Sequence, residues 1–124
     1  MRVFKTKSFV RFAVDQGIAD AELWEAISRA EKGLIDADLG GGVIKQRVAR
    51  NGQGRSRGFR TIILFRRTDK AFFTYGFAKS DRADISRNEL KAFRKLAEIL
   101  LSLEDDALTA AVKNGTITEI MSHG

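Results

Sequence analysis

The chain has 124 residues, with 22 Lys or Arg, 16 Asp or Glu and a formal net charge of +6. This length suits one domain over residues 1–124, and 44% hydrophobic residues argue against disorder. Cysteine is absent, which excludes disulfides and thiolate sites. The only histidine, His123, lies one residue from the end, where chains are usually frayed, which argues against histidine metal clusters and against Ser-His or Cys-His catalysis. No apolar run is long enough to span a membrane and the N-terminal segment lacks the apolar stretch of a secretory signal, so we expect a cytoplasmic protein.

The N-terminal third is expected to form a strand and a helical hairpin. Residues 2–5 form the strand, and a short helix capped by Ser8 follows it and ends at Gly17. Asp20 is a candidate cap for a second helix over residues 21–32. Apolar residues at spacings of three and four support both helices.

The middle of the chain is expected to form a β-meander. The glycine triplet at residues 40–42 is interpreted as a flexible joint, after which the apolar period changes from 3.6 to 2. Three strands follow, over residues 43–50, 59–67 and 71–77, and they are rich in β-branched and aromatic residues. Residues 51–58 between the first two strands are expected to be a turn-rich loop.

The C-terminal part is expected to form two helices and a last strand. Ser86 and Glu89 match a capping box for a helix that reaches about residue 102. A shorter helix over residues 105–113 and a strand over residues 116–121 follow. The predicted fold class is α+β, with an antiparallel sheet and helices packed on one side of it.

Positive charge is concentrated in the meander. Residues 44–82 contain eleven Lys or Arg and two acids, a net charge of +9, whereas the rest of the chain is −3. The bases are Lys45, Arg47, Arg50, Arg55, Arg57, Arg60, Arg66, Arg67, Lys70, Lys79 and Arg82. Such a surface is typical of a protein that binds a polyanion, most often nucleic acid. A solvated basic face is the alternative, but solubility does not require the charge to gather on two strands and their loop.

Five of these cations are expected to converge on one face of the sheet. Lys45 and Arg47 point the same way, because alternate residues of a strand share a face. Arg60 on the returning strand can lie across from them, and Lys79 and Arg82 come at the end of the third strand. A surface that only attracts phosphate does not need its cations to converge in this way.

A cationic site of this kind can cleave RNA by attack of the ribose 2′-OH on the adjacent phosphate. The reaction needs a base, cations that hold the phosphorane charge, and an acid for the leaving 5′ oxygen. Arginine suits the second task, and lysine suits proton transfer only if its pKa falls from about 10.4. Tyr75 and Asp81 are alternative proton carriers, although packing among phenylalanines is the simpler explanation for Tyr75. Acids do not cluster on these strands, so no metal or other cofactor is implied.

The loop between the first two meander strands does not match a nucleotide-binding loop. Its Gly-Gln-Gly is followed by bases, but the Gly-Lys-Ser/Thr ending and the helix of a P-loop are missing. We therefore expect Arg55 and Arg57 to lie along a nucleic-acid backbone. A plain hairpin loop is the alternative.

The run GGGVIKQRVARNGQGRSRGFRTIILFRR, followed by AFFTYGFAKSDRADI, resembles the HigB-type branch of the RelE/ParE toxin superfamily over about residues 39–101. The resemblance depends on three motifs taken together. They are the K-x-R of the first meander strand, the Gly58-Phe59-Arg60 at the start of the second, and the GFAKS at the end of the third. It implies a RelE-like fold and the toxin of a type II toxin–antitoxin system, which enters the ribosomal A site and cleaves mRNA there. It also implies an antitoxin partner, commonly with a helix-turn-helix domain.

The resemblance also implies the catalytic cations. They fall on Lys45, Arg47, Arg60, Lys79 and Arg82. The chain departs from the family near the start of the last long helix, where typical RelE members carry a tyrosine and this chain has Ile85 and Ser86. His123 lies out of range of the histidines that HigB members use. The general base therefore stays open.

The leading hypothesis is a ribosome-dependent mRNA endonuclease, an mRNA interferase that inhibits translation. In it, Arg47 and Arg60 stabilise the phosphorane, and Lys45 or Lys79 transfers a proton. The RNA backbone is held by Arg50, Arg55 and Arg57. The alternatives are a ParE-like inhibitor of DNA gyrase, which has no need of the cations shared with ribonucleases, and a non-catalytic RNA-binding module, which does not require their convergence.

Overall fold

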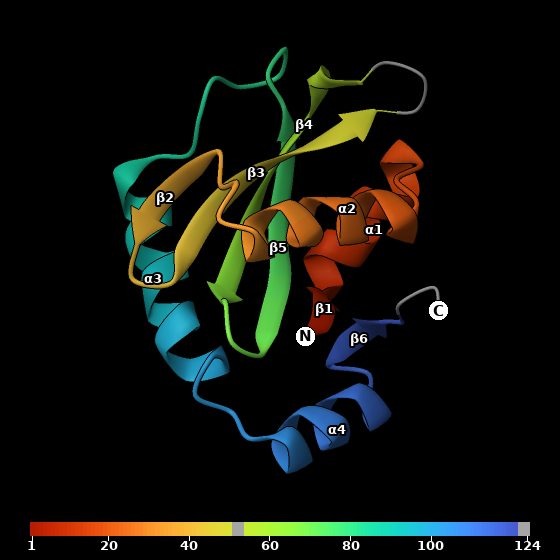
Figure 1. The fold of residues 1–124 in the computed structure, drawn as a ribbon, viewed down its shortest axis with the longest axis vertical. Coiled ribbons are helices and arrows are strands. Elements are labelled where there is room, and N and C mark those ends of the chain that lie inside the picture. The colour runs from red at the N-terminus through yellow and green to blue at the C-terminus, as the bar shows by residue number, and fades with distance from the viewer. Residues whose placement is uncertain (51–53, 122–124) are drawn as a thin grey trace.

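The computed structural model describes residues 1–50 and 54–121, with the backbone alone for residues 54–57. Helices and strands alternate irregularly along the chain (Figure 1). In order they are β1 (Arg2–Thr6), α1 (Lys7–Gln16), α2 (Asp20–Glu31), β2 (Ala37–Gly40), β3 (Val43–Arg50), β4 (Gly54–Arg66), β5 (Lys70–Ala78), α3 (Arg87–Leu100), α4 (Asp105–Lys113) and β6 (Ile117–Ile120).

The strands form one sheet with the order β2-β3-β4-β5-β1-β6. The predicted meander β3-β4-β5 is confirmed, because both of its strand pairs are antiparallel. The predicted loop over residues 51–58 is wrong from Gly54 on, where β4 already begins, and residues 51–53 lie outside the described residues. The prediction of a wholly antiparallel sheet is wrong, because β1 lies parallel to β5 and antiparallel to β6. The chain passes from β1 through both N-terminal helices before it reaches the meander, so no tight turn forces β1 to run against its neighbour.

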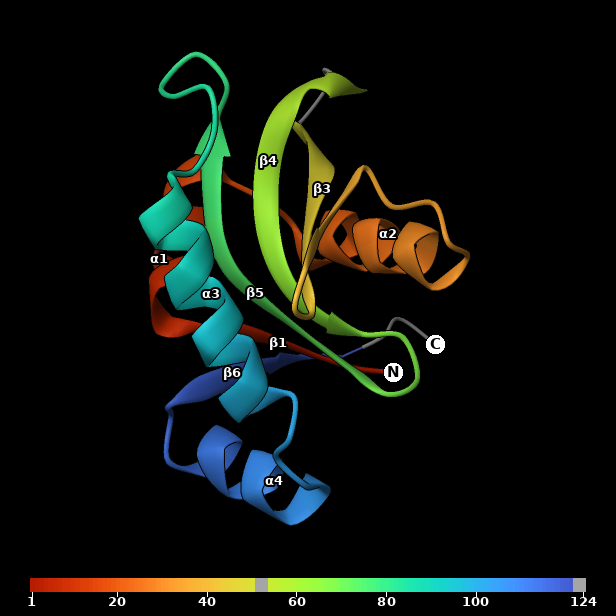
Figure 2. The ribbon, with the colours of Figure 1, turned by 90° about the vertical axis from the view of Figure 1, so that its left-hand side faces the viewer.

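Helices cover both faces of the sheet, so the prediction that they pack on one side is also wrong. Figure 2 shows α2 and α3 on opposite sides of the strands. The core with α1 and α2 contains Val3 and Ile63, whereas the core with α3 and α4 contains Phe4 and Ile62. Adjacent residues of one strand point to opposite faces, and both are apolar here. Such doubly apolar strands need a cover on each side.

The caps of the two N-terminal helices differ from those predicted. Thr6, not Ser8, caps α1 by accepting from the backbone N–H three residues on, at 3.4 Å. The Ser8 hydroxyl instead donates to the Thr74 carbonyl of β5 at 3.3 Å. Asp20 is the first residue of α2 and makes no cap, because its carboxylate pairs with Lys5 Nζ at 3.0 Å. In both cases the polar side chain that could cap the helix is bonded to the sheet instead, Ser8 to β5 and Asp20 to Lys5 of β1.

The glycine triplet is the turn of a β-hairpin, not a flexible joint. Residues 37–40, for which no strand was predicted, form β2 and pair with β3. Gly40, Gly41 and Gly42 all have positive φ, between 64° and 83°, which L side chains adopt rarely. A Cβ at Gly41 would lie 2.9 Å from the Arg94 side chain of α3. The glycines therefore serve both the turn and the close approach of this helix.

The C-terminal elements agree with the sequence. The capping box of α3 is confirmed, since Ser86 accepts from the Glu89 amide at 3.1 Å and Glu89 accepts from the Ser86 amide at 2.7 Å. This helix ends at Leu100, slightly earlier than predicted, and α4 has the predicted bounds.

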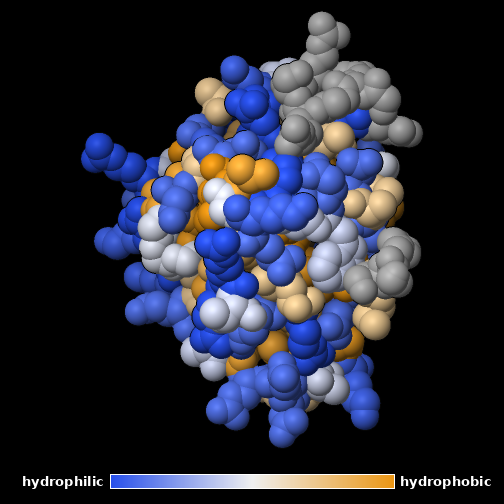
Figure 3. Space-filling view, viewed as in Figure 1, coloured by the Kyte–Doolittle hydropathy of each residue, from blue (hydrophilic) through white to orange (hydrophobic). Residues whose placement is uncertain are grey.

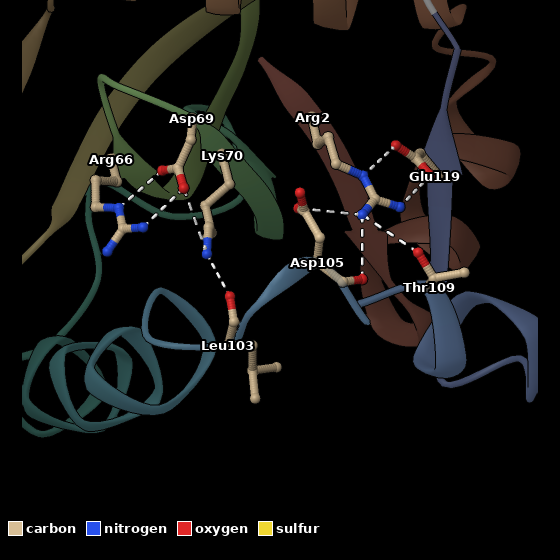
Figure 4. Close-up of polar contacts among 8 residues, drawn as sticks. All are labelled: Arg2, Arg66, Asp69, Lys70, Leu103, Asp105, Thr109 and Glu119. Carbon is tan, nitrogen blue, oxygen red and sulfur yellow. Dashed lines mark hydrogen bonds and ion pairs between the residues drawn. The ribbon is translucent and has the colours of Figure 1, made fainter. Parts of the chain in front are cut away.

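A buried lysine and a surface arginine attach the α3–α4 connection and α4 to the sheet (Figure 4). Lys70, at the start of β5, is 3% exposed and donates to the Leu103 carbonyl. Arg2 on β1 makes two bonds to Glu119 of β6, at 2.8 and 2.9 Å, and also reaches Asp105 of α4 at 3.4 Å. The C-terminal elements are therefore held by polar contacts as well as by the core.

The molecular surface in the view of Figure 1 is largely hydrophilic, with separate small hydrophobic areas between polar side chains (Figure 3). Within the described residues, every helix is too short or too polar to cross a lipid bilayer.

Candidate active site

Gln46 determines how the K-x-R strand presents its cations. Its side chain is fully buried, and Nε2 donates to the carbonyls of Ala26 and Leu34 at 3.0 and 3.2 Å. These bonds tie β3 to α2 and to the segment that follows it. Because residues alternate across a strand, Lys45 and Arg47 then point to the opposite face, the one that α3 covers.

The backbone of Arg47 is held by side chains that precede β2 in the chain. The β2–β3 pairing begins at Ala37, opposite Lys45, so Arg47 has no strand partner on that side. Asp36 Oδ2 accepts from the Arg47 amide at 2.7 Å, and Arg29 of α2 donates to the Arg47 carbonyl. Arg29 and Asp36, which were not predicted, thus satisfy both polar groups and hold Arg47 in place.

Arg60 lies directly across from Arg47, as predicted. The register depends on Gly58, because a Cβ there would lie 2.0 Å from the Val48 carbonyl oxygen. Only glycine allows β3 and β4 to approach so closely at this irregular point of the ladder. This explains physically why a glycine opens the Gly-aromatic-Arg motif.

Four predicted cations line one cavity of about 310 Å³. The lining residues are Asp36, Ala37, Lys45, Arg47, Arg60, Lys79 and Ala83. They come from the start of β2, from the facing strands β3 and β4, and from the loop after β5. A concave site with several cations and one carboxylate, itself engaged with a backbone amide, attracts an anion strongly.

Asp84 is an unpredicted member of the site. Its carboxylate pairs with Lys45 Nζ at 3.1 Å across the cavity rim. Burial acts to raise the pKa of Asp84, but bonds from the Ile85 amide and from Lys45 outweigh it and lower that pKa. Asp84 is therefore ionised at neutral pH. The sequence did contain a signal for Asp84, which is its position just beyond the basic segment and close to the GFAKS motif.

Arg82 is not brought into the cavity. Its guanidinium makes a bidentate pair with Glu89 of α3, at 2.6 and 3.0 Å, and donates to the Tyr75 hydroxyl at 3.1 Å. Hydrogen bonding from Arg82 lowers the pKa of Glu89 to about 2. Tyr75 also packs beside Phe77, with ring centroids 5.9 Å apart. Neither Arg82 nor Tyr75 lines the cavity, so the structure brings together four of the five predicted catalytic cations.

The comparison with known families is decisive for the identity of the chain. The sequence model of the protein family described as the RelE toxin of the RelE/RelB toxin–antitoxin system matches residues 1–120. The chain belongs to the RelE toxin family. The match spans all elements from β1 to β6, in agreement with the predicted RelE-like α+β fold, and the family implies an antitoxin partner. No curated protein matches the sequence.

The remaining predicted residues of this RelE-family toxin lie away from the cavity or outside the described side chains. Arg50 stacks on Phe59, 4.6 Å from the ring centroid, on the face of the β-hairpin that α1 covers. Arg55 and Arg57 belong to β4, but their side chains are among those the structure does not describe. Asp81 is exposed in the loop after β5, and His123 is outside the described residues.

Proposed function

We propose that this toxin is a metal-independent endoribonuclease that cleaves mRNA on the ribosome and so stops translation. The convergence of Lys45, Arg47, Arg60 and Lys79 in one cavity supports the proposal. A site that must hold a pentacoordinate phosphorane needs several donors aimed at one point, and fixed cations meet this need. A surface that only binds RNA does not need them gathered in a cavity.

In the proposed reaction the ribose 2′ oxygen attacks the adjacent phosphorus, and the bond to the 5′ oxygen breaks. The products are a 2′,3′-cyclic phosphate and a free 5′-hydroxyl. Arg47 and Arg60, from facing strands, hold the non-bridging oxygens through their planar sets of donors. Lys45 or Lys79 transfers a proton, either from the 2′-OH or to the leaving oxygen.

Asp84 has a place in the same scheme. Before RNA arrives, its carboxylate is the counterion of Lys45. The scissile phosphate takes over that role when it enters the cavity, and the Asp84 side chain, which is 54% exposed, turns to solvent.

The proposed partners are the ribosomal A site, mRNA and an antitoxin of the helix-turn-helix type, and the site of action is then the cytoplasm. Arg50, Arg55 and Arg57 are proposed to contact RNA backbone outside the cavity. Arginines serve this purpose well, because their charge persists at all relevant pH values.

Induced expression in a bacterium tests the proposal. We expect protein synthesis to stop and mRNA fragments with cyclic phosphate ends to appear. Arg60→Ala should relieve the arrest, whereas Arg11→Ala, which removes an exposed arginine on α1, should not. Arrest of DNA replication while translation continues would favour the gyrase inhibitor instead. Ribosome binding without any cleavage would favour the RNA-binding module.

A further inference from the structure

Arg82 connects three segments at the edge of the cavity. Its guanidinium nitrogens donate to the Tyr75 hydroxyl at the end of β5, to both Glu89 oxygens in the first turn of α3, and to the Asp84 carbonyl between them. Four of the five N–H groups of the guanidinium are thereby engaged. Its positive charge faces the Glu89 carboxylate, and this hydrogen bonding raises the pKa of Arg82 still further.

The loop that contains Arg82 carries three residues of the site. Lys79 and Ala83 line the cavity, and Asp84 pairs with Lys45 across its rim. The backbone bonds that order the start of this loop are those from Asp81 and Arg82 to the Ala78 carbonyl. Most of the loop is exposed, so few packing contacts define its course.

We propose that Arg82 is a positioning residue, which holds this loop so that Lys79 lines the cavity and Asp84 pairs with Lys45, and that it does not contact the RNA. The inference rests on the proposed nuclease function. A phosphate that recruited Arg82 would have to break a bidentate ion pair, one of the stronger arrangements available to arginine. Glu89 is also fixed independently, because it accepts from the Ser86 amide in the capping box.

The role predicts that Arg82 and Glu89 act as one unit. In single-turnover cleavage on programmed ribosomes at saturating toxin, Arg82→Ala and Glu89→Ala should each slow the reaction about 10–100-fold, since misplacement by about 1 Å has effects of this size. The double variant should be no slower than the slower single variant. Ribosome affinity and its dependence on salt should stay at the wild-type level.

Ser86→Ala is the matched control. It removes the other half of the capping box but leaves the pair between Arg82 and Glu89 intact, so cleavage should continue at nearly the wild-type rate. Multiplicative effects of the two single changes would show that Arg82 and Glu89 act independently and would overturn the proposal. A salt slope that falls by about 0.7 in Arg82→Ala would indicate a direct phosphate contact and would also overturn it.

Amide hydrogen exchange in the free protein supplies a measurement that does not depend on activity. Exchange across residues 80–85 should be faster in Arg82→Ala and Glu89→Ala than in wild type, and unchanged in Lys79→Ala. Unchanged exchange in Arg82→Ala overturns the inference. If wild type does not cleave RNA at all, the proposed function fails, while the exchange data still decide whether Arg82 holds the loop.

Discussion

Arg47 and Arg60 are direct partners across the β3–β4 pair, and both point into the cationic cavity. Like charges placed opposite each other on adjacent strands destabilise a sheet. Two features nevertheless stabilise this pairing, the close approach of the strands at Gly58 and the hydrogen bond that Asp36 accepts from the Arg47 amide. A bound phosphate would relieve the repulsion, so the unfavourable pairing is consistent with an anion site.

Removal of one of these arginines should separate stability from activity. Arg60→Ala should leave the melting temperature unchanged or raise it slightly at low salt, because the repulsion disappears, while cleavage falls about 10²–10³-fold. Thermal denaturation and single-turnover cleavage measure the two effects. Arg66→Ala serves as the control, since it breaks an ion pair with Asp69 and should lower the melting temperature without affecting cleavage. A large loss of stability in Arg60→Ala would instead assign Arg60 a role in folding.

The role of Lys45 can be read from two substitutions. If Lys45 transfers a proton, as we expect, Lys45→Arg should lose about 10²–10⁴-fold in rate although the charge is kept, because guanidinium stays protonated. If it only stabilises charge, Lys45→Arg should be nearly silent and Lys45→Met severe. Single-turnover kinetics on programmed ribosomes distinguish the two cases. A fully active Lys45→Arg would move the proton transfer to Lys79.

Arg55 and Arg57 are expected to affect binding but not chemistry. Each change to alanine should weaken ribosome or RNA association and reduce the slope of log affinity against log salt by roughly 0.7–0.9. Cleavage at saturating toxin should survive. Titrations at several salt concentrations, followed by single-turnover assays, provide the measurements. Loss of cleavage at saturation would place this part of the hairpin in the catalytic site.

Acid should destabilise the toxin through two ion pairs at its surface. Hydrogen bonds from Arg82 and Arg66 lower the pKa values of Glu89 and Asp69 to about 2, from 4.5 and 3.8. A carboxylate with a lower pKa in the folded state stabilises that state above its ordinary pKa, and this stabilisation is lost as the pH falls towards 2. Melting temperatures between pH 5 and 2 should therefore decline less steeply in Glu89→Gln and Asp69→Asn than in wild type. Parallel curves would indicate that solvent screens both pairs completely.

A methyl group at position 58 should damage the site without removing any charge. In Gly58→Ala the new Cβ would meet the Val48 carbonyl oxygen, so β3 and β4 must separate locally. We expect a loss of about 1–3 kcal/mol in the free energy of unfolding and a lower cleavage rate, because Arg47 and Arg60 lose their alignment. Denaturant titration and cleavage assays test this. Gly17→Ala is a useful comparison, since open space surrounds its Cβ position and any effect there reflects only the positive φ.

Local sequence patterns were sufficient for most elements of the fold. The capping box at Ser86 and the alternation in the meander depend on neighbours along the chain, and both predictions are confirmed. The pairing of β1 with β5 depends on residues that are distant in sequence, and no local pattern reports it. Adjacent apolar residues in β1, β4 and β5 were the signal for two covered faces. Neighbours in a strand, such as Val3 and Phe4, point to opposite sides of the sheet, so both sides need a cover.

The site was predictable to the extent that strand geometry determines it. Alternation along β3 placed Lys45 and Arg47 on one face, and the antiparallel pairing of β4 with β3 brings Arg60 opposite Arg47. The loop after β5 has no such periodicity. Whether Arg82 faces the cavity or Glu89 depends on side-chain geometry around the first turn of α3, which the sequence alone does not specify.

The position of β1 between β5 and β6 has a consequence for how the toxin folds during synthesis. Arg2 pairs with Lys70, and Val3 pairs with Ile120, so β1 must wait for partners that are synthesised much later. Such non-local pairing is associated with slow folding. The meander that carries the cationic cavity, in contrast, is assembled from strands that follow one another directly. The β3–β4 hairpin is therefore expected to form early in synthesis, and the sheet is completed only when β6 has been synthesised.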